Sequence, residues 1–313
     1  MKYFIKKTLL FSIIGLTLFL LFVIPINIKN DPYGVIKGDM ANQVIEPNQH
    51  YLKINHLLKN PKKYNSYFFG SSRVGKIDTR NIHDCNSWYN LSYSEAIPYE
   101  NLTDLKLLLQ NGVVIKNIVI GLDNISYLVA PEIHLNQALR KPYQSYRSIF
   151  YYLTLKPSLS FTKENIKKTV HYDIANSGFP IVLYKDKWID SNKSAHINDP
   201  KFCTPSWSNY YSDRIKNSIR EITEIIEICS NNNINLKLFI NPMHSTTYLK
   251  LNEKRYFNFL TLLAGQKAFY DFSGINKITS NNFNYYETSH YRPFIGELIK
   301  SIILEQKKSD FVH

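Results

Sequence analysis

The sequence predicts an α/β domain with a mainly parallel sheet, preceded by one apolar N-terminal helix. Two patterns carry this prediction. An almost unbroken apolar run covers residues 8–26, and from about residue 60 to 305 strand-like segments alternate with helix-like segments. Strands separated by helices of this length favour a parallel sheet with helices on both faces. The stretch 31–313 is long enough to form one such domain with an insertion.

The apolar run, Thr8–Ile26, is long enough to cross a membrane. Its 19 residues would form a helix of about 28 Å at 1.5 Å per residue, which covers the hydrocarbon core of a bilayer. The chain continues past Ile26 without the small-residue step that marks a signal-peptide cleavage site. Residues 1–30 are therefore predicted to be an uncleaved membrane anchor. A cleaved signal peptide is the alternative.

Flanking charge predicts the orientation of this anchor. Lys2, Lys6 and Lys7 precede the apolar run and favour an N-terminus inside the cytoplasm, although Lys29 and Lys37 beyond it weaken the bias. The domain that follows is then expected outside the cytoplasm, in the periplasm or at the cell surface. The formal net charge of +13 does not indicate a nucleic-acid partner, because Lys and Arg are dispersed and no nucleic-acid-binding signature is present. Anionic lipid head groups or acidic glycans are the simpler partners for this charge.

The predicted elements follow in chain order. Five strands are expected, at Ser66–Phe69, Trp88–Tyr93, Val113–Leu122, Ile234–Ile240 and Ala268–Phe272. Four helices are expected at Tyr99–Gln110, 208–231, Leu251–Gly265 and Pro293–Glu305. The first helix carries a leucine stripe and is followed by Asn-Gly, a typical stop, and the last begins with a proline, which suits a first helical turn. Residues 131–207, rich in Tyr, Lys, Ser and Pro, do not fit this alternation and are predicted to be an insertion that could lie over the active-site mouth.

Two short segments far apart in the chain predict a serine hydrolase or transferase site. Gly70-Ser71-Ser72 follows the first strand-like segment, and Glu287 precedes His290 by three residues near the end. A serine hydroxyl is a weak nucleophile until an imidazole takes its proton, and the imidazole needs a carboxylate to fix its tautomer. Sites of α/β proteins usually lie where parallel strands end. Ser72 is therefore the predicted nucleophile, His290 the base and Glu287 the orienting acid.

At these residues the chain resembles the SGNH (GDSL-type) hydrolase superfamily. The first block of that family is Gly-Asp-Ser, which Gly70-Ser71-Ser72 matches with serine in place of aspartate. Its last block is Asp-x-x-His ahead of the C-terminal helix, which Glu287–His290 matches with glutamate. The resemblance spans roughly residues 60–305 and implies a three-layer sandwich with a mainly parallel sheet. It is closest to the membrane-anchored members that acylate or deacylate cell-envelope polysaccharides.

The middle blocks depart from the family pattern. There, a glycine and an asparagine complete the oxyanion hole with the backbone N–H of the nucleophile, whereas this chain has Ser92 and Asp123 at those positions. An ionised carboxylate cannot donate a hydrogen bond, and the loss of one donor costs about 100- to 1,000-fold in rate. Three explanations stay open: Asn124 supplies the amide, Asp123 is held protonated, or Asp123 has another role and the hole has two donors. The third is favoured.

Arg73 and His244 are further candidate binding residues. Arg73, beside the nucleophile, either holds an anionic group of the substrate or forms a structural ion pair, and the ion pair is favoured. His244 follows a strand-like segment, so it either contacts substrate or is a hydrogen-bonded loop histidine. No cofactor or metal is predicted, since Cys85, Cys203 and Cys229 have spacings that suit no zinc site. A disulfide between the first two cysteines stays open.

The sequence thus predicts a membrane-anchored, SGNH-like serine acyltransferase or esterase acting on O-acyl groups of a cell-envelope polysaccharide. In both reactions Ser72 would carry the acyl group while Glu287 and His290 drive proton transfer, and the acceptor, sugar hydroxyl or water, would separate them. A transferase implies a multi-spanning membrane partner that supplies the acyl group. The alternative is a non-catalytic glycan-binding or assembly protein that retains the fold, which Ser92 and Asp123 favour.

Overall fold

The fold is described from a computed structural model of the chain. The structure describes residues 1–37, 46–143, 146–155, 171–181, 183–206, 212–306 and 311. The start of the helix predicted at 208–231 and parts of the insertion predicted at 131–207 lie outside these residues.

A five-stranded, all-parallel sheet forms the centre of the domain, in the order β2-β1-β3-β6-β7. The strands are β1 (Ser66–Gly70), β2 (Trp88–Asn90), β3 (Asn117–Leu122), β6 (Asn235–Ile240) and β7 (Tyr270–Asp271). The chain leaves β1 toward β2 on one side and later returns to β3 on the other. The carboxyl ends of β1 and β3 therefore meet at a topological switch point, where open α/β sheets usually bind ligands.

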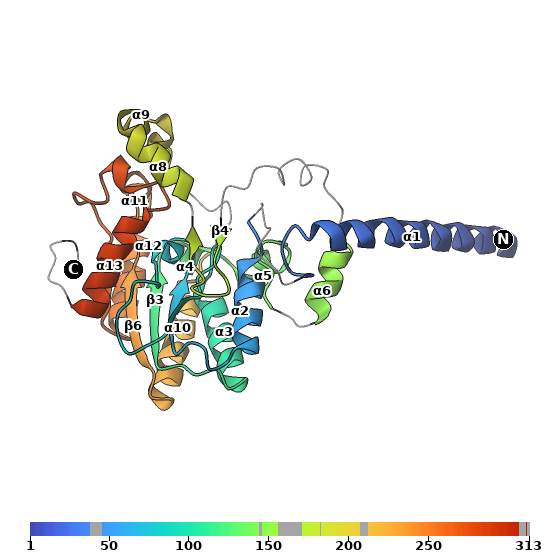
Figure 1. The fold of residues 1–313 in the computed structure, drawn as a ribbon, viewed down its shortest axis with the longest axis horizontal. Helices are drawn as coiled ribbons and strands as arrows, with labels where there is room; N and C mark the ends of the chain where they lie inside the picture. Colours follow the sequence, from blue (N-terminus) through green and yellow to red (C-terminus); the bar gives the residue numbers. More distant parts are fainter. Residues whose placement is uncertain are drawn as a thin grey trace.

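Helices cover both faces of this sheet (Figure 1). Tyr67 and Phe69 of β1 lie in the same core cluster as apolar residues of α2 (Gln49–Lys59), α3 (Pro98–Gln110), α10 (Ile215–Asn231) and α12 (Glu253–Ala264). Phe68 faces the opposite side, where it lies in one cluster with α13 (Pro293–Glu305). Successive side chains of a strand point to opposite faces, so the apolar run Tyr67–Phe69 is explained by burial on both faces.

Shorter elements complete the fold. They are α4 (Ile125–Leu128), α5 (Pro131–Leu135), α6 (Tyr146–Leu153), α8 (Leu183–Ser191), α9 (Lys193–Ile197), α11 (Ser245–Tyr248), the 3₁₀ helices η1 (Val74–Lys76), η2 (Pro200–Cys203) and η3 (Asn282–Asn284), and an antiparallel pair of β4 (His171–Tyr172) with β5 (Pro180–Ile181). The predicted insertion therefore contains four described α-helices, α5, α6, α8 and α9, together with the 3₁₀ helix η2.

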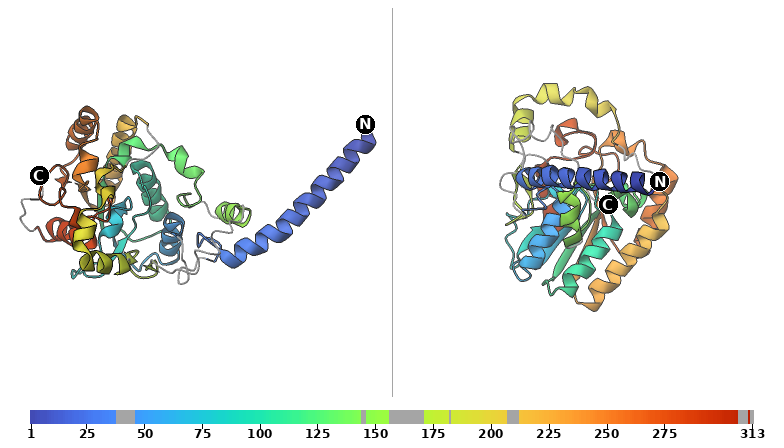
Figure 2. Two further views of the ribbon diagram at one scale, coloured as in Figure 1. Left: turned by 90° about the horizontal axis from the view of Figure 1, so that it is seen from above. Right: turned by 90° about the vertical axis from the view of Figure 1, so that its right-hand side faces the viewer.

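An N-terminal helix, α1 (Lys2–Asn30), projects from the domain (Figures 1 and 2). In the described part of the chain one helical stretch, Tyr3–Asn30, is long and apolar enough to cross a membrane. Most of its large apolar side chains are exposed, but Val23, Asn27 and Asp31 are buried against the domain. These three positions recur every four residues, so one stripe of the last two turns makes the contact.

Several predicted boundaries need correction. The helix at Pro293–Glu305 is confirmed at both ends, but the strand predicted at Val113–Leu122 is wrong in its first four residues, because β3 starts at Asn117. Val114 and Lys116 donate their backbone N–H groups to carbonyls of the loop before β1, outside the sheet ladder. Likewise α10 starts at Ile215, since the N–H of Arg214 is used by the carbonyl of Tyr127. The second and fifth strands are shorter than predicted, and the fifth keeps two residues.

Candidate active site

The turn that carries Ser72 depends on two facing glycines. Gly70 ends β1 with φ +135°, a conformation that L side chains rarely adopt, and a Cβ there would lie 2.5 Å from the carbonyl oxygen of Gly121 and 2.7 Å from Cγ2 of Val74. Gly121 is its partner in the register of β1 with β3. The missing side chains let Val74, in η1, pack directly on the sheet. This packing bends the chain sharply just after Ser72 and exposes the serine at the carboxyl end of β1.

The structure brings together the three residues predicted as a catalytic triad. Ser72 Oγ lies 2.7 Å from Nε2 of His290, and Nδ1 of the same ring lies 2.5 Å from Oε1 of Glu287. The backbone N–H of His290 also donates to Oε1 of Glu287, at 2.9 Å. The side chains of His290 and Glu287 are about one-third exposed, at 31% and 37%. For Nε2 to accept the Ser72 proton, the ring must carry its proton on Nδ1, which faces Glu287.

The charge of Glu287 suits an orienting role. Burial alone would raise the pKa of this carboxyl, but the hydrogen bonds and charge of His290, together with the ammonium of Lys76, hold the pKa below its ordinary value. Glu287 is therefore ionised at neutral pH, and an ionised carboxylate stabilises the imidazolium that forms when His290 takes a proton. Burial in turn lowers the pKa of Lys76, and Glu287 opposes that shift.

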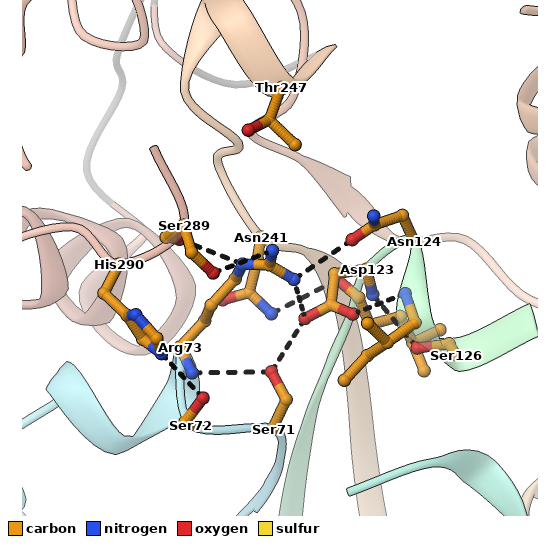
Figure 3. Close-up of polar contacts among 12 residues, drawn as sticks. Ser71, Ser72, Arg73, Asp123, Asn124, Ser126, Asn241, Thr247, Ser289 and His290 are labelled. Atoms are coloured by element: carbon orange, nitrogen blue, oxygen red, sulfur yellow. Dashed lines mark hydrogen bonds and ion pairs between the residues drawn. The ribbon is translucent and has the colours of Figure 1, made fainter. Parts of the chain in front are cut away.

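A buried ion pair lies behind the nucleophile (Figure 3). Nη1 of Arg73 lies 2.8 Å from Oδ2 of Asp123, and the same carboxylate oxygen accepts a 2.7 Å hydrogen bond from Oγ of Ser71. Arg73 also donates to Oδ1 of Asn124 at 3.2 Å, and to the carbonyl and hydroxyl oxygens of Ser289 at 3.0 and 3.1 Å. Arg73 thus joins the turn after β1, the turn after β3 and the loop that carries His290.

These contacts locate three sequence-predicted residues. Asp123 accepts from Ser71, from Arg73 and, through Oδ1, from the backbone N–H of Ile125 at 3.1 Å. Both carboxylate oxygens are thereby used in fixing the site. Asn124 presents its carbonyl oxygen to Arg73. Arg73, with its side chain 5% exposed, is placed as a structural ion pair.

Ser92 lies in a loop that is fixed by hydrogen bonds to buried charged side chains. Its backbone N–H donates to Oδ1 of Asn90 at 3.0 Å, and its carbonyl oxygen accepts a 2.5 Å bond from the ammonium of Lys53, which is fully buried. Burial lowers the pKa of Lys53 to about 7. The next residue, Tyr93, donates its hydroxyl to Asp104 at 2.7 Å and its backbone N–H to the carbonyl of Gly70. The loop is therefore fixed beside the nucleophile turn, with the Ser92 N–H already engaged.

A second buried cluster supports the far end of the same loop. Nδ1 of His134 lies 2.7 Å from Glu100, and its Nε2 lies 3.5 Å from Glu95, which also pairs with Arg140 at 3.2 Å. Burial alone would lower the pKa of His134, but the hydrogen bonds and charges of the two glutamates raise it to about 9. His134 is therefore an imidazolium held between two carboxylates at neutral pH.

His244 is buried in a hydrogen-bonded loop. Its Nε2 lies 2.9 Å from Oδ1 of Asn282, and its Nδ1 accepts from the backbone N–H of Thr246 at 3.2 Å. The ring is 2% exposed and packs against the rings of Phe202 and Tyr285. Burial lowers its pKa. Both ring nitrogens thus form hydrogen bonds within the protein. This matches the interpretation of His244 as a hydrogen-bonded loop histidine and not the interpretation as a substrate contact.

Sequence reasoning missed a clamp between the insertion and the catalytic loop. Nε and Nη2 of Arg292 lie 2.8 and 2.7 Å from carboxylate oxygens of Asp186 and Asp190 on α8, and the hydroxyl of Tyr286 donates to Asp186 at 2.5 Å. These residues flank Glu287 and His290 on both sides. The only signal in the sequence was the proximity of Arg292 to the histidine, because its partners are about one hundred residues away.

The contacts of Ser72, His290 and Glu287 can support nucleophilic attack by the serine hydroxyl. Among the described residues, the backbone N–H of Ser72 has no hydrogen-bond partner and can donate to a developing oxyanion. No group of three or more His, Cys, Asp or Glu side chains able to hold a metal occurs within the described ranges, and Cys85, Cys203 and Cys229 are unpaired there.

No protein-family model matches the chain, and no curated protein matches it.

Proposed function

We propose that this protein is a membrane-anchored, SGNH-like serine acyltransferase or esterase that acts on O-acyl groups of a cell-envelope polysaccharide. The hydrogen-bonded chain Ser72, His290 and Glu287 at the switch point of the sheet carries this proposal. Along the chain the nucleophile comes first, then the acid and then the histidine. The SGNH family has these residues in the same order, which supports the SGNH assignment. The apolar helix α1 supports membrane anchoring. Lys2, Lys6 and Lys7 at its start support a domain outside the cytoplasm.

The reaction follows from the positions of the side chains. Oγ of Ser72 attacks the acyl carbonyl carbon while its proton passes to Nε2 of His290, and the backbone N–H of Ser72 donates to the oxyanion. The bond to the donor oxygen then breaks, and His290 returns the proton to that leaving oxygen. A sugar hydroxyl or water then attacks the acyl carbon while His290 accepts its proton. The bond between the acyl carbon and Oγ of Ser72 breaks, and His290 returns the proton to Oγ. Glu287 stays ionised and stabilises the imidazolium in both steps.

A serine-directed fluorophosphonate probe tests the catalytic half of the proposal. Wild-type protein in detergent should be labelled at Ser72, and Ser72→Ala and His290→Ala should each abolish labelling without loss of folding. Ser230→Ala, at the exposed end of α10, is the matched serine control and should label like the wild type. Because triad members act as a unit, the double variant should be little worse than either single one. Labelling that survives in Ser72→Ala would refute the nucleophile.

A second assay addresses the substrate. Cells that carry only Ser72→Ala should show a changed O-acyl content of their envelope polysaccharide, measured by NMR of the purified glycan. A loss of acyl groups indicates transfer from a membrane-bound acyl donor, and a gain indicates deacylation. Acyl content equal to that of wild-type cells would refute both.

The alternative is a non-catalytic glycan-binding or assembly protein that retains the fold. It is favoured by the engagement of the Ser92 N–H with Asn90 and of Asp123 with Arg73, because neither group can then donate a hydrogen bond to an oxyanion. A protein of this kind would bind the glycan but fail to label with the probe. Binding of the glycan by Ser72→Ala with wild-type affinity, together with unlabelled wild-type protein, would support it.

A further inference from the structure

Helix α1 is joined to the domain through a buried polar contact near the end of its apolar run. Nδ2 of Asn27 donates to the carbonyl oxygens of Leu153 and Leu155, at 2.9 and 2.8 Å. Leu153 is the last residue of α6, so Asn27 satisfies carbonyls that the helix end would otherwise leave without a partner. Asn27 is 4% exposed. The anchor therefore caps a helix of the domain.

The contact continues on both sides of Asn27. Val23, one turn earlier, is 5% exposed, and Asp31, one turn later, accepts backbone N–H bonds from Ile36 and Lys37 at 3.1 and 2.8 Å. Tyr33, just beyond α1, packs on Tyr152 of α6 with ring centroids 5.7 Å apart. The end of α1 and the start of the domain thus form one packed joint.

Helix α6 has a buried face and an exposed aromatic side chain. Tyr152 is 2% exposed and its hydroxyl is hydrogen-bonded to Asn48 and Ala138. Phe150, two residues earlier, is 67% exposed. Figures 1 and 2 place α6 beside the C-terminal end of α1, at the edge of the domain from which α1 projects, and in Figure 1 it runs across the direction of α1.

The length of the apolar run fixes where α6 would lie relative to a bilayer. Val23 lies three residues before Ile26, the end of the run, which is about 4.5 Å at 1.5 Å per residue. Head-group regions add roughly 5–8 Å to each side of the hydrocarbon core. If residues 8–26 fill that core, the joint between α1 and α6 falls at the boundary between acyl chains and head groups.

Charge at this edge suits the same location. Lys29 and Lys37 are exposed at the end of α1 and just after it, and the ammonium of Lys141 lies 4.4 Å from the ring centroid of Tyr151 on α6. Aromatic side chains that stand beside cations are typical of the membrane–water interface, where rings enter the acyl boundary and ammonium groups reach anionic lipids.

We infer that α6 is an in-plane interfacial helix, whose exposed side carrying Phe150 lies in the bilayer that holds α1. This inference rests on the membrane anchoring in the proposed function and adds a second point of contact. With α1 and α6 both in the bilayer and joined through Asn27, the domain cannot pivot freely on its anchor. The active site is then held at a fixed orientation above the membrane.

Site-directed spin labelling of the full-length protein tests the inference. The two exposed cysteines are replaced as Cys85→Ser and Cys203→Ser, while Cys229, 2% exposed, is retained. A nitroxide is then placed in three variants, Phe150→Cys on α6, Leu16→Cys on α1 and Phe257→Cys on α12. Leu16 and Phe257 are 59% and 48% exposed, and α12 lies on the side of the domain away from α6 (Figure 1).

The readout is the ratio of collision rates with oxygen, which concentrates in lipid, and with a water-soluble nickel chelate, in vesicles of phosphatidylcholine and phosphatidylglycerol. The label at position 150 should favour oxygen, with a ratio between those of the labels at positions 16 and 257. A ratio equal to that at position 257 would overturn the inference. So would low accessibility to both reagents, because a protein surface would then cover Phe150.

The control on α1 separates this inference from the proposed function. A water-like label at position 16 would refute the anchor itself, whereas a lipid-like label there with a water-like label at position 150 would refute α6 alone. Asn27→Leu, which removes both hydrogen bonds and keeps α1 apolar, should leave position 16 in lipid and shift position 150 toward the water-like ratio. An unchanged ratio at position 150 in Asn27→Leu would overturn the role of Asn27.

Discussion

Replacement of Asp123 by asparagine tests whether this carboxylate is a structural partner or a misplaced oxyanion donor. In the structure, Oδ2 accepts from both Arg73 and Ser71, and Oδ1 accepts from the backbone N–H of Ile125. The carboxylate is 1% exposed and the guanidinium 5%. Asparagine has one acceptor oxygen where aspartate has two, so either orientation of its amide turns an NH₂ group toward a donor.

The expected cost is large because both charges are buried. Loss of one partner of a buried ion pair costs about 3–5 kcal/mol, and the neutral acceptors that Arg73 keeps on Ser289 and Asn124 favour the lower value, about 3 kcal/mol. At roughly 2–4 °C per kcal/mol, the melting temperature should fall by about 6–12 °C. Because Arg73 also holds Ser289 beside His290, the second-order rate of probe labelling at Ser72 should fall by about 100-fold.

The matched control is Asp213→Asn. Asp213 pairs with Arg255 at 3.1 Å but is 61% exposed, so its loss should cost less than about 1 kcal/mol. A double-mutant cycle with Arg73→Met and Asp123→Leu should show that both changes together cost much less than the sum of the two, because no buried charge is left alone. Wild-type stability and raised labelling in Asp123→Asn would refute this reasoning and restore Asp123 to the oxyanion hole.

Three further predictions concern the supports of the site. Gly121→Ala should destabilise the protein by about 1–3 kcal/mol in denaturant titrations, because its Cβ would collide with Val74 and Phe239, whereas Gly265→Ala, which meets only ordinary contacts, should be nearly neutral. Arg292→Leu should remove the cation that ties α8 to the catalytic loop and slow probe labelling by about 10-fold, while an unchanged rate would show that the clamp does not position His290. His134 has a folded-state pKa raised from 6.5 to about 9, so its stabilising charge is fully present below pH 6.5 and is lost as pH rises through 9. The difference in unfolding free energy between wild type and His134→Gln should therefore be largest near pH 6 and shrink by pH 10, and a difference that grows with pH would contradict this assignment.

The sequence was most informative where local chemistry decides structure. The start of the helix at Pro293–Glu305 was predicted to the residue because proline suits a first helical turn. The proximity of Ser72 and His290 was predictable because Ser72 follows a strand-like segment, where α/β sites usually lie, and a serine nucleophile needs an imidazole with a carboxylate beside it. In contrast, Val113–Lys116 read as strand from their β-branched residues, although their hydrogen bonds go to a loop.

What could not be predicted was the choice of partners between distant segments. Arg73 was expected to form an ion pair, but nothing in the residues near it names Asp123, which lies fifty positions away. The ion pairs between Arg292 and α8 could not be predicted for the same reason, since isolated charged residues leave no periodic pattern in a sequence. The fixed loop at Ser92 was hidden as well, because Lys53 sits in a helical segment where lysine is normally exposed.

Ser92 and Asp123, the two residues that depart from the SGNH pattern, are both hydrogen-bonded within the buried network around the nucleophile turn. Asp123 cannot stabilise an oxyanion while it neutralises Arg73, and the N–H of Ser92 cannot reach one while it donates to Asn90. Each missing donor corresponds to about 100- to 1,000-fold in rate. An enzyme with this site would therefore be slow in transfer and in hydrolysis alike, because both reactions pass through the same oxyanion. The Asp123→Asn and Ser72→Ala variants together decide between that enzyme and a binding protein, because only the enzyme loses labelling at Ser72 when its supports are disturbed.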